Sequence, residues 1–219
     1  MSKSAESSPL FTASAWAVPL TVALAIVHIP ALAPALAAGG RDVASEQTSP
    51  RLNRFTYYER GSELFLGVDT RAAQYAGQDE RGAMFPLGIG LANLSDGPLY
   101  VGPESFVLEA SDGRRYSAVA YEQFLRDYRR SRTDERLADT FIQTMNTRYS
   151  TFRFTPWRPF PPAGDIDVIQ RNVELGHAFW TRSYLYFPLP EGGVRGRTFK
   201  LLVKPRDNEE TYVVTFSVS

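Results

Sequence analysis

Residues 85–98 read FPLGIGLANLSDGP, an apolar alternation that runs into a dense turn cluster. Phe85, Leu87, Ile89 and Leu91 point to one face of an extended chain, and the small or cyclic residues between them point to the other. This period of two is typical of a β-strand with one buried face. The Asn-Leu-Ser-Asp-Gly-Pro cluster that follows ends the strand.

The same period recurs on both sides of this stretch. It predicts further strands at residues 64–68, 99–101, 106–110, 116–118, 173–175, 179–187, 198–204 and 211–218. The Asp112-Gly113 dipeptide predicts a hairpin between residues 106–110 and 116–118, because it tolerates the positive φ of a two-residue turn. Many short strands separated by turn signals, without alternating helices, predict a mainly β fold, an antiparallel β-sandwich.

One segment departs from this period. Tyr121, Phe124, Leu125 and Tyr128 have the spacing of an amphipathic helix, and a second apolar stripe continues to Met145. We expect residues 120–147 to form one or two helices inserted between strands of the sandwich.

The tract 152–162 combines four aromatic residues with four prolines. Prolines at this density exclude a central strand, because each removes a backbone donor from the ladder. We expect an extended surface loop or edge here. Together with the helices, the tract makes an insertion at about residues 120–162.

The N-terminal residues 1–38 are expected to be a signal peptide. No charged residue occurs between Ala15 and Ala38, and the stretch closes with Ala35-Leu36-Ala37, a small-x-small pattern that suits signal peptidase. We expect cleavage after Ala37 or Ala38 and a periplasmic or extracellular protein. The alternative is an uncleaved transmembrane anchor, since the apolar run is long enough to span a bilayer.

After cleavage, residues 39–54 would be a flexible lead-in and residues 55–219 the sandwich domain. The remaining chain of about 180 residues would bury roughly 70% of its unfolded surface, enough for a core without covalent cross-links. The sequence holds no cysteine, which excludes disulfides, thiolate metal sites, cysteine nucleophiles and a lipobox.

The charge balance argues against two classes of partner. Lys and Arg number 24, as do Asp and Glu, so the formal net charge is zero. Nucleic acids and anionic membrane surfaces both favour a basic excess. We therefore expect no nucleic-acid partner, and no membrane insertion after signal cleavage.

Four stretches carry a resemblance to a known group of domains. Residues 87–95, 106–116, 173–176 and 184–190 resemble the small immunoglobulin-like domains of unknown function in exported bacterial proteins and lipoproteins. The resemblance spans about residues 64–219 and implies an immunoglobulin-like fold and export, but no activity. The chain departs from the pattern by lacking a lipobox cysteine and by carrying the insertion at 120–162.

Signatures of catalysis are sparse. His28 lies in the expected signal peptide, which leaves His177 as the sole imidazole of the mature chain and excludes a multi-histidine metal site. No Gly-x-Ser-x-Gly elbow and no Gly-x-x-x-x-Gly-Lys loop occurs. Asp165 and Asp167 are the carboxylate pair available for acid–base chemistry or calcium, with a solvated loop as the alternative. We expect no catalytic residue, cofactor or metal.

Two features of the insertion are candidates for contact with a partner. Arginine favours planar, bidentate partners such as carboxylates, although nearby acidic residues would neutralise much of a basic run. Aromatic rings on a proline-stiffened loop offer contact area at small entropic loss, unless they simply cover an open edge of the sandwich. The candidate partner-binding residues are Tyr121, Phe124, Tyr128, Arg126, Arg129, Arg130, Trp157 and Phe160.

These observations predict a non-catalytic exported envelope protein that acts as an interaction or accessory module. Its partner would be another envelope protein, with the oligomeric state left open. The alternatives are a periplasmic hydrolase that uses carboxylates, and a carbohydrate-binding module that uses Trp157.

Overall fold

In the computed structural model, residues 48–78, 84–162, 164 and 168–219 are described. The expected signal peptide, most of the expected lead-in and the pair Asp165 and Asp167 lie outside these ranges. None of the described helices is long and apolar enough to span a membrane.

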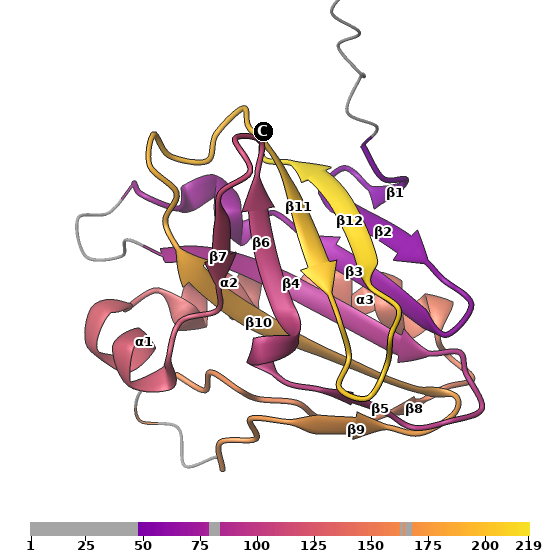
Figure 1. The fold of residues 1–219 in the computed structure, drawn as a ribbon. Coiled ribbons are helices and arrows are strands. Elements are labelled where there is room, and N and C mark those ends of the chain that lie inside the picture. The colour runs from indigo at the N-terminus through magenta and orange to yellow at the C-terminus, as the bar shows by residue number, and fades with distance from the viewer. Residues whose placement is uncertain (1–47, 79–83, 163, 165–167) are drawn as a thin grey trace, which may run out of the picture. The chain divides into compact units, whose positions relative to one another are not determined.

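The alternating stretch of the sequence forms β4 (Met84–Asn93), in which every residue is buried. It lies inside a six-stranded sheet (Figure 1). The order of that sheet is β1 (Arg51–Asn53), β2 (Thr56–Arg60), β3 (Leu64–Asp69), β4, β10 (Phe179–Pro188) and β8 (Arg153–Phe154). All neighbours pair antiparallel except β8, which runs parallel to β10.

A second sheet has four antiparallel strands. Its order is β12 (Tyr212–Ser217), β11 (Thr198–Val203), β6 (Phe106–Ala110) and β7 (Arg115–Ser117). A short antiparallel pair joins β5 (Leu99–Val101) to β9 (Val173–Leu175). Two 3₁₀ helices span Ala72–Tyr75 and Pro103–Ser105.

The two larger sheets pack against each other through the alternating apolar residues. The Phe85 ring of β4 lies 5.1 Å from the Phe199 ring of β11 and 6.4 Å from the Phe216 ring of β12, measured between centroids. All three rings are fully buried, and burial of each such side chain contributes about 1.5–3 kcal/mol. The mainly β, antiparallel character predicted from the period of two is confirmed.

The insertion forms three helices rather than one or two. They are α1 (Tyr121–Asp127), α2 (Ser131–Leu137) and α3 (Asp139–Arg148). The chain leaves helical geometry at Tyr128, which is extended, and α2 and α3 meet at Ala138. The polar stretch between the two apolar stripes therefore contains a short helix of its own.

Helix α3 packs on the face of the six-stranded sheet that is turned away from the second sheet. Gly67 of β3 and Gly90 of β4 are cross-strand partners on this face. A Cβ atom at position 90 would lie 2.8 Å from Phe141 Cζ and 2.8 Å from Met145 Cε. The small residues that alternate with the core residues of β4 therefore provide the space into which α3 fits.

The predicted hairpin between β6 and β7 is present, with a loop one residue longer than expected. The Gly113 amide donates to the Ala110 carbonyl, and the Ala110 amide donates to the Arg114 carbonyl, both at 2.9 Å. Gly113 has φ of 80°, the left-handed conformation that ends a three-residue hairpin loop.

Two segments form strands that the sequence did not predict. Residues 51–53 were expected in the flexible lead-in but form β1, and residues 56–60 form β2 although no strand was predicted there. The tract 152–162 is irregular apart from β8 at the edge of the sheet, as its prolines indicate.

Candidate functional site

Most of the aromatic residues expected to face a partner are core residues. Phe124, Tyr128, Trp157 and Phe160 are only 1–7% exposed. The rings of Phe124, Tyr128 and Phe160 surround Tyr186 of β10 at centroid distances of 4.6, 4.9 and 5.5 Å. These rings cover part of the sheet, so the expectation of an exposed aromatic surface is not met at these positions.

Tyr121 and Trp157 show the same arrangement. Tyr121 is partly buried, and its ring packs on Phe124 at 6.0 Å. The Trp157 ring stacks on Phe106 at 5.8 Å, and its Nε1 donates to the Arg171 carbonyl at 3.0 Å. Large aromatic rings stabilise a fold most when they are buried, which explains why this tract turns inward.

The three candidate arginines have partners close by. Arg126 donates to Asp127 at 2.9 Å, Arg129 to the Leu125 carbonyl at 2.7 Å, and Arg130 to the Tyr75 carbonyl at 2.9 Å. Arg126 thus has a nearby acidic partner, as the alternative interpretation expects, whereas Arg129 and Arg130 bond to main-chain carbonyl groups. His177 lies in an exposed turn, where its Nδ1 is 2.8 Å from the Ser95 carbonyl.

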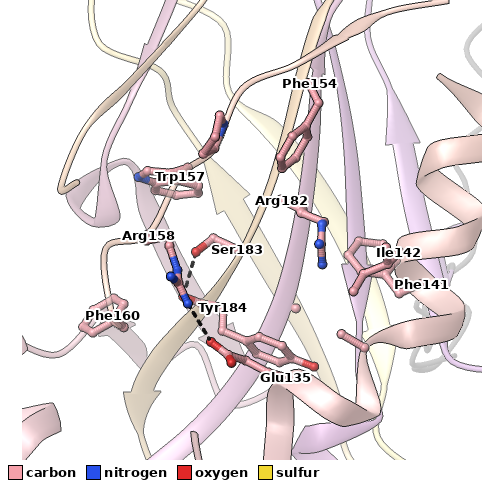
Figure 2. Close-up of a pocket in the computed structure, with 13 residues that line it drawn as sticks. Glu135, Phe141, Ile142, Phe154, Trp157, Arg158, Phe160, Arg182, Ser183 and Tyr184 are labelled. Carbon is pink, nitrogen blue, oxygen red and sulfur yellow. Dashed lines mark hydrogen bonds and ion pairs between the residues drawn. The ribbon is translucent and has the colours of Figure 1, made fainter. Parts of the chain in front are cut away.

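A cavity of about 380 Å³ lies beside the aromatic tract (Figure 2). Arg182 and Tyr184 of β10 line it together with Gly88 of β4. The helices α2 and α3 and their junction supply Glu135, Ala138, Phe141 and Ile142, and the tract supplies Phe154, Pro156, Trp157, Arg158 and Phe160. The lining is mostly aromatic and aliphatic, with three charged side chains.

The three charged residues of the cavity have different surroundings. Arg158 Nη2 lies 3.8 Å from Glu135 Oε1, and both side chains are substantially exposed. The Arg182 guanidinium carbon lies 5.8 Å from the centroid of the Phe154 ring. Burial lowers the pKa of Arg182 below its ordinary value, because charge is disfavoured away from water.

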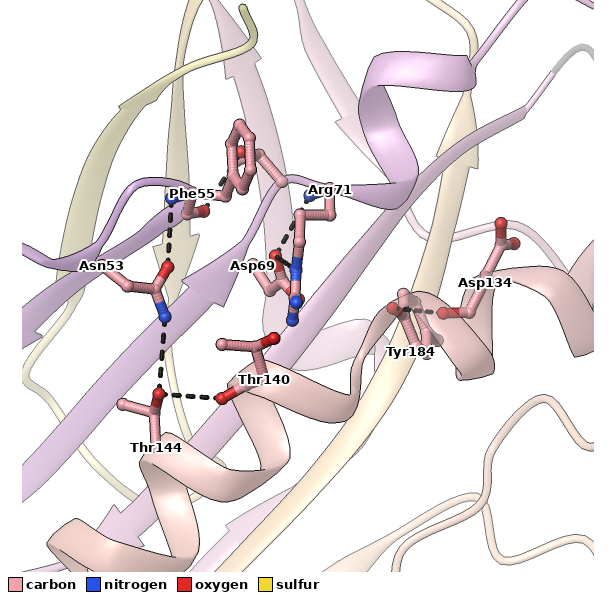
Figure 3. Close-up of polar contacts among 9 residues, drawn as sticks. Asn53, Phe55, Asp69, Arg71, Asp134, Thr140, Thr144 and Tyr184 are labelled. Carbon is pink, nitrogen blue, oxygen red and sulfur yellow. Dashed lines mark hydrogen bonds and ion pairs between the residues drawn. The ribbon is translucent and has the colours of Figure 1, made fainter.

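Tyr184 lines the cavity and also contacts Asp134, a residue with a buried carboxyl group. Its hydroxyl donates to the main-chain oxygen of Asp134 at 2.7 Å, which ties β10 to α2 (Figure 3). The Asp134 side chain is 1% exposed and accepts a 2.7 Å hydrogen bond from the Tyr128 hydroxyl. Burial raises the pKa of Asp134 to about 7.

Further polar contacts hold α3 and the end of β3 (Figure 3). Asn53 of β1 donates to Thr144 Oγ1 at 3.4 Å, and the Thr144 hydroxyl donates to the Thr140 carbonyl at 2.8 Å. At the end of β3, Arg71 Nη2 donates to Asp69 Oδ2 at 2.6 Å. The Asn53 contact ties α3 to β1, and the Arg71 contact holds the end of β3.

The sequence analysis did not identify this cavity, because its walls come from three separated segments. One signal was present in β10, where Arg182 shares a face with Trp180, Tyr184 and Tyr186. A cation within an aromatic face is unusual for a core strand. Within the described ranges, no three His, Asp or Glu side chains are grouped so as to hold a metal ion.

Comparisons with known proteins give one structural similarity. No protein-family model matches the sequence, and no curated protein matches it. A crystal structure of a candidate lipoprotein from Bacillus subtilis subsp. subtilis strain 168 is similar, with a TM-score of 0.37 and 10% identity. The similarity covers 73% of this chain and 38% of that one. A likeness of this size transfers no function, so the site is interpreted from its own residues.

Proposed function

We propose that this chain is a non-catalytic, exported binding module that holds a small ligand in the cavity between α2–α3 and the aromatic tract. The cavity itself carries the proposal. Its volume of about 380 Å³ lies within the range of small-molecule sites, which are mostly apolar with a few placed polar groups.

The insertion supports a binding role because it builds two of the three walls. Ligand sites are commonly formed by segments added to a rigid framework. Here the framework is β10, which is hydrogen-bonded to β4 along its length. The contact between Tyr184 and Asp134 then fixes α2 against that framework.

We also propose an immunoglobulin-like relationship for the fold. The order β3-β4-β10 in one sheet and β12-β11-β6-β7 in the other corresponds to strands A-B-E and G-F-C-C′ of immunoglobulin domains. The charge-free stretch 15–38 supports export. Another envelope protein as partner stays a prediction.

The proposal is tested by two-dimensional NMR of the domain during titration with a library of small aromatic and aliphatic compounds. Compounds that bind should shift resonances of residues that line the cavity. Ile142→Trp, which fills the cavity, should abolish these shifts. Val168→Trp is the matched control, since Val168 is 86% exposed and does not line the cavity. Shifts that persist in Ile142→Trp, or no shifts for any compound, would contradict the proposal.

A further inference from the structure

Arg182 lines the aromatic cavity and makes no direct ion pair with a described residue. Within the described part of the chain, no hydrogen bond or ion pair reaches its guanidinium group, and its ring contact with Phe154 is at 5.8 Å. A cation–π contact near the 6 Å limit satisfies none of the five N–H donors of the fork. Arg182 is only partly buried and its nitrogen atoms are not among the buried unpartnered atoms of the described residues, so these donors are accessible from the cavity and available to a ligand.

The charges around the cavity favour an anion of low charge. Arg158 and Arg182 supply two positive charges, and Glu135 supplies one negative charge that is already close to Arg158. Of these two cations, Arg158 has an ion pair within the described ranges and Arg182 has none. Glu135, Tyr184 and the exposed Asp139 also act on Arg182, and each favours its charged form.

The shape of the guanidinium group and of the cavity walls narrows the class of ligand further. Guanidinium groups bind planar carboxylates through two parallel hydrogen bonds. The side chains of Phe141, Ile142 and Phe154 lie around Arg182 in Figure 2 and offer apolar surface to a flat body. A doubly charged phosphate at the same place would be repelled by Glu135 and Asp139 more strongly than a monocarboxylate would.

We propose that the cavity binds an aromatic monocarboxylate, with the carboxylate on the Arg182 guanidinium and the ring against the aromatic walls. This inference rests on the proposed function, since it names the ligand class of the same cavity. Arg182 is then the residue that sets specificity, and the ring contacts supply the remaining affinity.

The test compares 2-naphthoate with 2-naphthalenemethanol, which has the same ring system and no charge, by isothermal titration calorimetry. We expect 2-naphthoate to bind roughly 10- to 100-fold more tightly, the effect of hydrogen bonds to a charged group. Arg182→Gln should remove this preference by weakening 2-naphthoate alone. Arg153→Gln is the matched control, because Arg153 lies over the Phe179 ring at 5.5 Å and does not line the cavity.

A second variant keeps Arg182 and its packing intact. Glu135→Gln removes the one negative charge of the lining, so 2-naphthoate should bind several-fold more tightly while 2-naphthalenemethanol is unaffected. This measurement decides the question even if Arg182→Gln does not fold.

The outcomes separate the two proposals. Equal affinity for both probes, unchanged in Arg182→Gln, would overturn the carboxylate inference and leave the cavity as an apolar binding site. Tighter binding of 2-naphthyl phosphate than of 2-naphthoate would overturn the preference for a monocarboxylate. Binding of neither probe, with no ligand in the NMR screen, would overturn the proposed function as well.

Discussion

The Tyr128 hydroxyl donates a 2.7 Å hydrogen bond to Asp134 Oδ2, whereas Oδ1 of the same carboxyl is buried and has no partner among the described residues. Tyr186 adds a weaker contact with Oδ2 at 3.4 Å. The carboxyl group is thus held by phenols rather than by a cation. Burial raises the pKa of this carboxyl to about 7, and the hydrogen bonds from the two phenols, which favour the ionised form, offset only part of that effect.

Asp134 should therefore make the protein less stable as the pH rises. Its pKa is about 7 in the folded protein and 3.8 ordinarily. Between these values the folded state binds a proton that the unfolded chain has lost, so the free energy of unfolding decreases with a slope approaching about 1.4 kcal/mol per pH unit. Urea denaturation from pH 4 to 8 should show this decrease in the wild type and a smaller one in Asp134→Asn. The same decrease in both proteins would show that Asp134 is not the cause of this pH dependence.

Gly90→Ala should destabilise the packing of α3 on the sheet. The added Cβ would lie 2.8 Å from Phe141 and Met145, so both side chains must move, and overpacking of this kind costs about 1–3 kcal/mol. Gly97→Ala is the control, because a Cβ there meets nothing within 4 Å. Denaturation midpoints measure both variants; equal midpoints would mean that α3 does not pack closely at Gly90.

Trp157→Ala should cost about 3–5 kcal/mol in the free energy of unfolding, as for a large aromatic side chain removed from a core. Trp157→Phe keeps most of the stacking on Phe106 and loses the hydrogen bond to the Arg171 carbonyl, so its cost should be about 1 kcal/mol. Phe154→Ala, at a position 43% exposed, should cost less than Trp157→Ala. The reverse order in chemical denaturation would place Trp157 at the surface.

Arg71→Met should be strongly destabilising at neutral pH. Asp69 is fully buried, and Arg71 donates to it through Nε and Nη2 at 2.6–3.1 Å. Removing the cation leaves a buried, uncompensated carboxylate, which costs about 3–5 kcal/mol. The double variant Asp69→Asn with Arg71→Met should recover much of that loss, as measured by urea denaturation. A double variant no more stable than Arg71→Met would show that the ion pair is not the cause.

The sequence predicts most of the framework because buried strands leave a period of two. The stretches around Leu64, Phe85 and Phe199 are all strands in the structure. β1 and β2 were missed because burial along them is partial and does not alternate. The helical spacing of Tyr121, Phe124 and Tyr128 also identified α1, since local periodicity is visible without tertiary information.

The site was harder to predict, because burial and cavities depend on long-range contacts. Trp157 and Phe160 have the composition of an exposed binding loop, yet they pack on Phe106 and Tyr186 from distant parts of the chain. The arginines near Tyr128 suggested a surface for anions. The arginine that lines the cavity without an ion pair to a described residue is instead Arg182, in a strand otherwise typical of a core.

The packing of α3 on the paired Gly67 and Gly90 can also help to identify proteins related to this one by descent. The two glycines must stay small as long as Phe141 and Met145, one helical turn apart, rest on them. In a relative that has lost the helices, larger residues at both strand positions would become favourable, since they would cover the vacated face. Descendants of a common ancestor should therefore show the two features together or neither. This joint pattern can distinguish true relatives from other β proteins when overall identity is low.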